Sequence, residues 1–202
     1  MKKTILITFS ATLGFSANAQ DVNIPDAKFK AALLSDTINF INTNKDNEIQ
    51  LSEATAFKGT INVYNKDISD LTGIEAFANL TKLSCSYNSL KTLNISNNIF
   101  LKELQCSYNS LNSLNVSKNT FLNDLDCENN SLSSLDVSKN TEIKFLICNS
   151  NFIKSLDLSK NISLFRLDCY SNSLNFLNIA TVIIKILKIC YQEIILIFLA
   201  YK

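Results

Sequence analysis

The sequence predicts an α/β repeat solenoid, in which successive coils of the chain stack on one another. The main observation is a repeat of 21 residues without insertions, with segments that begin at Leu80, Leu101, Leu122, Ile143 and Leu164. Self-similarity at a fixed period of this length is typical of solenoids. A second observation is the shared template L-x-x-L-x-C-x-x-N-x-L-x-x-L-x-V-S-x-N, which spaces apolar residues along the whole coil. The third is helical patterning before the first segment, which suits a cap over the open end.

Each segment opens with a predicted strand. In L-x-x-L-x-C the inward positions alternate, as at Leu83 and Cys85, and this is the period of a strand with one buried face. Stacked coils therefore form a parallel sheet, while Leu90, Leu93 and Ile95 fill the interior from the other side. Several coils must stack, because one coil cannot bury this apolar surface alone.

A row of asparagines directly follows the strands, at Asn88, Asn109, Asn130, Asn151 and Asn172. The chain has only three glycines and one proline, so asparagine, which tolerates left-handed backbone, must make the turns. An inward amide at such a turn can bond backbone groups of its own coil and of the next. We expect this row to close the turns; the alternative is a polar stripe that binds a ligand.

Five cysteines follow the same period and occupy an inward strand position: Cys85, Cys106, Cys127, Cys148 and Cys169. Disulfides are one alternative for an exported chain. Neighbours in the row are close enough, but their parallel Cβ vectors suit the disulfide dihedral angle badly. A metal ladder is another alternative, although a stacked row does not converge on one ion. We therefore predict buried free thiols that pack as small hydrophobic residues.

The template resembles the leucine-rich repeat, with cysteine at the last apolar position of the strand. The segment "ISDLTGIEAFANLTKL" resembles the stretch that leads into the repeats of bacterial internalin-like proteins. This resemblance implies a right-handed coil, a parallel β-sheet on the concave face, a small α-helical N-terminal cap and a surface-exposed protein. The expected domains are the cap at 20–58, an irregular first repeat at 59–79, and five repeats at 80–179, the last incomplete.

Two helices are expected in the cap. "PDAKFKAALL" begins with Pro25 and places Phe29 and Leu33 on one side, and Ser52 is a candidate N-cap for a helix at "EATAF". Between them lies a candidate calcium loop like that of an EF-hand, whose possible ligands are Asn42, Asn44, Asp46, Glu48 and Glu53 at loop positions 1, 3, 5, 7 and 12. Two amide ligands lower its charge and Asn47 replaces the usual glycine, so the alternative is a plain polar turn. No other cofactor is expected.

The two ends of the chain do not follow the repeat. Residues 1–19 show the charged, apolar and A-x-A regions of a secretory signal peptide, which implies export to the periplasm, the cell surface or the medium. Residues 180–202 lose the asparagines and are interrupted by Lys185, Lys188 and Glu193, so they make a poor membrane span. Our hypothesis is a frameshift near Thr181. If the codons are AT-rich, insertion of one nucleotide there changes the translated tail to an asparagine-rich sequence like that of the repeats. The alternative is a stop-transfer anchor.

Composition excludes several functions. Removal of the signal peptide takes away Lys2 and Lys3, so the formal net charge falls from +1 to about −1, which argues against a nucleic-acid partner. The chain has no histidine, and this excludes Ser-His and Cys-His nucleophile systems and histidine-based zinc sites.

Specificity in a solenoid belongs to the outward strand residues on the concave face. The candidate ligand-binding residues are Glu103, Asp124, Asp126, Glu128, Phe145, Ile147, Arg166, Asp168 and Tyr170. Exposed apolar and aromatic residues rimmed by charge suit an interface with a protein or glycan partner. The alternative is a solvated face whose hydrophobic residues are covered by the tail or a neighbouring coil.

Three functions follow from this surface. The first is a non-enzymatic binding module in cell-surface interaction or adhesion, and the second is a structural or adhesive spacer within a larger surface protein. The third is a polysaccharide hydrolase that uses Asp124 and Asp126 as an acid/base pair. We expect no pKa shift in these carboxylates, because they lie on an open sheet without a pocket.

Overall fold

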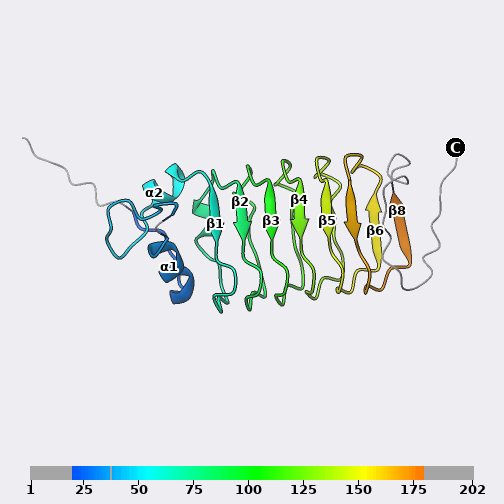
Figure 1. The fold of residues 1–202 in the computed structure, drawn as a ribbon, viewed down its shortest axis with the longest axis horizontal. Helices are drawn as coiled ribbons and strands as arrows, with labels where there is room; N and C mark the ends of the chain where they lie inside the picture. The colour runs from blue at the N-terminus through cyan, green and yellow to red at the C-terminus, as the bar shows by residue number, and fades with distance from the viewer. Residues whose placement is uncertain (1–19, 37, 180–202) are drawn as a thin grey trace, which may run out of the picture.

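The computed structural model describes residues 20–36 and 38–179. The predicted signal peptide and the aberrant tail therefore lie outside the described residues. The chain forms an elongated stack of coils with the helical cap at its N-terminal end (Figure 1). The predicted solenoid is thus confirmed. None of the described helices is long and apolar enough to cross a membrane.

A six-stranded parallel sheet runs along one side of the stack in the order β1-β2-β3-β4-β5-β7. Its strands are β1 (Thr60–Asn62), β2 (Lys82–Ser84), β3 (Glu103–Gln105), β4 (Asp124–Asp126), β5 (Phe145–Ile147) and β7 (Arg166–Asp168). From β2 onward the register advances by one repeat per coil, so Leu83 pairs with Leu104 and Leu104 with Leu125. These leucines are fully buried, because every coil places its alternate strand residues toward the interior.

A second, two-stranded parallel sheet joins β6 (Ser155–Leu158) and β8 (Phe176–Ile179) on the opposite side of the stack. The interior lies between the two sides and contains the repeat leucines together with Cys85, Cys106, Cys127 and Cys148, all fully buried. These four cysteines are free thiols, as predicted, and Cys169 in the last coil is partly buried. Desolvation raises the pKa of the Cys85 thiol to about 12.

The cap contains α1 (Ala27–Leu34) and α2 (Leu51–Ala56), and a short 3-10 helix, η1 (Ile74–Ala76), follows β1. Helix α1 buries Phe29 and Leu33, in agreement with the sequence pattern. The prediction of Ser52 as N-cap of the second helix is wrong, because that residue lies inside α2. The helix instead begins after Gln50, whose backbone N–H donates to the Glu53 carboxylate at 3.0 Å.

Candidate binding surfaces

The outward residues of the strands form columns along the sheet. The pairing places Glu103, Asp124, Phe145 and Arg166 in one column, and Gln105, Asp126, Ile147 and Asp168 in the next. The sheet therefore brings the predicted strand residues onto one surface, which changes from acidic at β3 and β4 to apolar and mixed at β5 and β7. Glu128 and Tyr170 follow the ends of β4 and β7.

The carboxylates of β3 and β4 differ in their partners. Glu103 forms an ion pair with Lys82 at 2.5 Å. Asp126 accepts the backbone N–H of Glu128 at 3.1 Å and the Ser107 hydroxyl at 3.2 Å. The Ser107 and Ser86 hydroxyls are also hydrogen-bonded to each other, at 2.9 Å.

The pKa values of Asp124 and Asp126 are both raised, which corrects the expectation of unshifted values. The main cause is desolvation in each case, although the sheet is open. The negative charge of Glu103, directly opposite on β3, adds to the shift of the Asp124 pKa. Neighbouring side chains in the columns thus remove enough water to favour the protonated forms.

The apolar part of the surface lies on β5 and just after β7. Phe145 is 37 % exposed and Tyr170 is 40 % exposed, whereas Ile147 is half-buried. The Phe145 ring packs edge-on against Phe165, with ring centroids 5.8 Å apart. Beside them the Arg166 guanidinium donates to the Asp168 carboxylate, from Nε at 2.9 Å and from Nη2 at 2.5 Å.

The asparagine row after the strands closes the turns, as predicted. The Asn130 amide donates to the carbonyl oxygens of Cys106, Cys127 and Glu128 at 3.0–3.2 Å. Its Oδ1 accepts the backbone N–H of Leu111 at 2.9 Å, so one side chain joins two coils. Asn88, Asn109, Asn151 and Asn172 also bond to carbonyl groups of their own and the preceding coil.

A family model described as the endo-β-N-acetylglucosaminidase EndoS LRR domain matches residues 32–161. The chain belongs to this family of leucine-rich-repeat domains. It is also an internalin-like bacterial leucine-rich-repeat protein with a cysteine ladder. The solved functional domain of InlJ from Listeria monocytogenes, described as including a cysteine ladder, is 32 % identical with a TM-score of 0.69. That match covers 78 % of this chain and 34 % of the InlJ chain.

Two further comparisons agree with a leucine-rich-repeat fold. Internalin J from L. monocytogenes serotype 4b is 41 % identical over 56 residues, which cover 28 % of this chain and 6 % of that protein. Internalin C2 from L. monocytogenes shares the fold at 17 % identity and a TM-score of 0.57, over 79 % of this chain and 81 % of its own. The chain thus spans at most about a third of the two InlJ relatives it matches.

A second asparagine row of the leucine-rich repeats was missed as a structural feature, although the template shows it at its last position. Asn98, Asn119, Asn140 and Asn161 are fully buried. The Asn119 amide donates to the carbonyl oxygens of Ile95 and Asn98 at 3.0 and 2.9 Å, and the other three repeat this pattern. The four rungs therefore tie each coil to the one before it on the side opposite the first row.

The candidate calcium loop joins the two cap helices of this leucine-rich-repeat domain. Asn44 donates to Asp46 at 2.8 Å and Glu48 pairs with Lys30 at 2.5 Å. Both Glu53 oxygens accept hydrogen bonds, from Thr43 and Asn44 on one side and from Gln50 on the other.

Among the described residues, no group of three or more acidic or sulfur-containing side chains is arranged to hold a metal ion. The buried Oδ1 of Asn42 has no hydrogen-bond partner among them, and it is the oxygen a calcium ion would use at loop position 1. This acceptor fits a cation. Glu53, in contrast, would have to give up its present hydrogen bonds before its oxygens could bind the ion. Calcium binding therefore stays a prediction.

Proposed function

We propose that this chain is an exported, non-enzymatic binding protein whose leucine-rich repeats recognise a protein or glycan partner through the concave face. The observation that carries the proposal is the exposure of Phe145 on β5 and of Tyr170 just after β7, where the inward strand residues are buried. Rigid aromatic side chains that are already ordered on a sheet lose little entropy on binding, and such residues dominate interface energies.

The charges beside the aromatic residues would set orientation and specificity. Glu103, Asp124, Asp126 and Glu128 make one end of the surface acidic, and the Arg166–Asp168 pair lies beside the apolar end. A partner with a basic region next to an apolar one would match this order. The relatives named as internalins support a role at the cell surface, and the predicted signal peptide supports export.

The proposal is tested with beads coated with the full chain and applied to cultured cells and to immobilised extracellular glycoproteins. We expect Phe145→Ala and Tyr170→Ala each to reduce adhesion about tenfold, the loss of one interface anchor. Phe152→Ala is the matched control, since Phe152 is 59 % exposed in the turn after β5 and outside the concave face. Thermal melting checks that every variant folds.

The two alternatives give different results. A spacer would tolerate both concave-face changes, and its adhesion would depend only on the number of repeats. A hydrolase would cleave a polysaccharide in a reaction that Asp126→Asn abolishes. The family description names the repeat domain of a glycosidase, and the match is to that repeat domain.

A further inference from the structure

Three tyrosines form a second candidate surface at the edge of the sheet where the strands end. We call Tyr64, Tyr87 and Tyr108 the tyrosine row. The rings of Tyr87 and Tyr108 are stacked with centroids 4.2 Å apart and an interplanar angle of 11°. Tyr64 lies against Tyr87 at 5.1 Å and 52°. Tyr64 and Tyr87 are 48 % and 43 % exposed, so each adds aromatic surface to this edge.

The backbone under the row does not favour tyrosine. Tyr87 has φ 58° and Tyr108 has φ 52°, in the left-handed region that bulky residues rarely adopt. The following coils have the same conformation at Asn129, Ser150 and Ser171, where small polar residues are found. Asparagine would therefore adopt this left-handed turn more readily than tyrosine does. The turn conformation does not explain why tyrosine is found at these positions.

Ring stacking offers one reason, because stacked aromatic rings stabilise each other. It does not explain why the stack is placed at an exposed edge. The Tyr108 hydroxyl also donates to the Glu128 carboxylate at 3.2 Å, which fixes the outer end of the row. The result is a rigid set of aromatic edges and phenolic hydroxyls on three successive coils.

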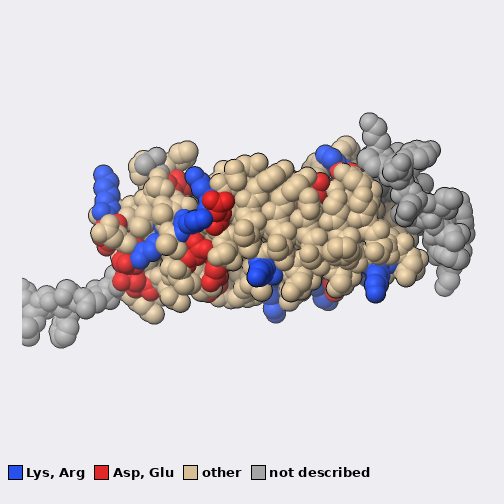
Figure 2. Space-filling model, turned by 90° about the horizontal axis from the view of Figure 1, so that it is seen from below, with Lys and Arg blue, Asp and Glu red and all other residues tan. Residues whose placement is uncertain are grey.

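The charged side chains next to the row are Lys66 and Asp67, which follow Tyr64, and Glu128, which contacts Tyr108. Strands β2 to β5 end at the lower side of the stack in Figure 1, and Figure 2 shows that side. There the coils have few acidic or basic side chains, which gather instead over the cap (Figure 2). Asp67 pairs with Lys28 at 3.5 Å and the Glu128 carboxylate accepts the Tyr108 hydroxyl, and a neutral polymer would leave both contacts in place.

We propose that the tyrosine row binds a neutral saccharide chain. Sugar rings have apolar C–H faces and hydroxyl groups that both donate and accept, and tyrosine offers an apolar ring with a hydroxyl of the same kind. A linear polymer would run along the stack and meet one tyrosine per coil. The row lies apart from Phe145 and Tyr170, so this inference does not rest on the function proposed for those residues.

Tyrosine fluorescence of the full chain tests the proposal, because the chain contains no tryptophan. The probes are neutral oligosaccharides of glucose, mannose and N-acetylglucosamine, with oligogalacturonate as the charged comparison. We expect at least one neutral series to change the emission saturably, with affinity that increases with chain length, and oligogalacturonate to have no effect. Tyr87→Asn and Tyr108→Asn should each weaken binding about tenfold, the loss of one good contact.

Three further variants separate binding from folding. Tyr108→Phe keeps the ring stack and removes one hydroxyl, so it should weaken binding without lowering the melting temperature. Asn129→Tyr adds a ring to the next coil at the same left-handed position and should strengthen binding. Phe121→Asn, at a residue that is 53 % exposed, removes an aromatic ring outside the row and should change nothing.

The proposal is overturned if no neutral series binds at millimolar concentration or if only oligogalacturonate binds. It is also overturned if Tyr87→Asn and Tyr108→Asn lower stability but leave saccharide affinity unchanged. Loss of a protein partner from these variants, without any saccharide binding, would assign the row to a protein instead.

Discussion

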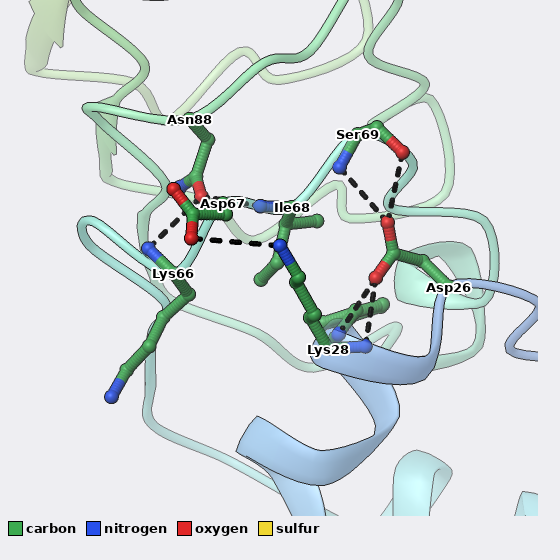
Figure 3. A network of polar contacts seen from close by, with 8 residues as sticks. Asp26, Lys28, Lys66, Asp67, Ile68, Ser69 and Asn88 are labelled. Atoms are coloured by element: carbon green, nitrogen blue, oxygen red, sulfur yellow. Dashed lines mark hydrogen bonds and ion pairs between the residues drawn. The ribbon is translucent and has the colours of Figure 1, made fainter.

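The carboxylate of Asp26 joins the helical cap to the first coil through Ser69. Its Oδ1 accepts the backbone N–H groups of Lys28 at 2.9 Å and Phe29 at 3.0 Å, which caps α1. Its Oδ2 accepts the Ser69 N–H at 2.9 Å and hydroxyl at 3.1 Å (Figure 3). The same oxygen also accepts the Asp70 N–H at 3.2 Å. One side chain therefore satisfies donors of both the helix and the solenoid.

Asp26→Ala should lower the free energy of unfolding by about 1–2 kcal/mol, as the loss of a helix cap does. Asp26→Asn should cost less, because asparagine retains one acceptor oxygen. Denaturant unfolding measures both. The control is Asp67→Asn, which removes a largely exposed ion pair with Lys28, tolerates the φ of 53° at this position and should cost less than about 0.5 kcal/mol. Equal losses for Asp26→Ala and Asp67→Asn would contradict this role of Asp26.

The same carboxylate makes cap docking dependent on pH. Burial opposes its ionisation, but the hydrogen bonds from Ser69, Phe29 and Asp70 outweigh this effect and lower the Asp26 pKa. A lowered folded-state pKa adds stability above the ordinary carboxyl value, and this stability is lost as pH falls through the lowered value. The free energies of unfolding of the parent and of Asp26→Asn should therefore converge in acid. A difference between them that stays constant down to pH 2 would refute the link between the Asp26 pKa and stability.

The repeats could be predicted from the sequence because burial recurs at fixed positions. Leu104 and Cys106 are buried for the same reason as Leu83 and Cys85, so one coil explains the others. Where the repeat breaks, prediction weakens: β1 pairs with β2 at Thr60 and Lys82, an offset of 22 residues. The wrong N-cap at Ser52 also arose outside the repeat, where a capping residue type alone does not fix the first residue of a helix.

The candidate binding surfaces were harder to predict, because outward positions have no recurrent burial requirement. Asp124 and Phe145 occupy the same column, and only the sheet register shows that they are neighbours. The left-handed backbone at Tyr87 and Tyr108 could likewise not be predicted, because tyrosine, unlike the asparagine at the equivalent position 129, does not indicate this conformation. The raised pKa of Asp124 depends on local desolvation by neighbouring coils, which residue type does not reveal.

The asparagines of the first row should contribute more to the free energy of unfolding than the exposed asparagines beside them. Asn109 donates to the carbonyl oxygens of Cys85, Cys106 and Ser107 and accepts the Leu90 N–H at 3.0 Å. Asn109→Ala leaves these backbone groups without their partner, so we expect a loss of about 2–3 kcal/mol in urea unfolding. Asn112→Ala, at an exposed position in the same coil, should cost less than about 0.5 kcal/mol. Similar losses from both would show that the turn closes without the amide.

The buried cysteines should be unreactive in the native chain. Desolvation raises the pKa of the Cys106 and Cys127 thiols, so almost no thiolate is present at pH 8. Iodoacetamide should label Cys85, Cys106, Cys127 and Cys148 only after denaturation, as mass spectrometry of peptides would show. Cys106→Ser should destabilise more than Cys106→Ala, because it buries a hydroxyl among apolar neighbours. Rapid native labelling of Cys106 would contradict its full burial.

Calcium remains a separate prediction for the cap. If Asn42, Asp46 and Glu53 bind the ion, calcium should raise the melting temperature and a chelator should reverse the rise. Glu53→Gln would remove that response, although it also weakens the hydrogen bonds to Thr43 and Gln50. Asn42→Ala gives a second test: the Asn42 Oδ1 has no hydrogen-bond partner among the described residues, and the change removes one other contact, from Nδ2 to the Asp46 carbonyl oxygen at 2.6 Å. An unchanged melting curve in millimolar calcium would remove the site.

Asp124→Asn should stabilise the protein at neutral pH. Desolvation and the opposite Glu103 raise the folded-state pKa of Asp124, so folding favours the protonated carboxyl. This contribution is fully present below the ordinary carboxyl pKa and is lost as pH rises through the raised value. Removing one charge from the cross-strand pair should therefore add about 0.5 kcal/mol at pH 7, and the gain should vanish below about pH 4.

Asp136→Asn provides a control of opposite sign. Hydrogen bonds from the backbone and side chain of Ser138 lower the Asp136 pKa, so this carboxylate stabilises the fold when it is ionised. Its replacement should reduce stability at pH 7, and the loss should shrink as pH falls through the lowered pKa. Unfolding measured from pH 3 to pH 8 should therefore give two curves of opposite slope relative to the parent. Parallel curves would show that desolvation on the open sheet is too weak to act on Asp124.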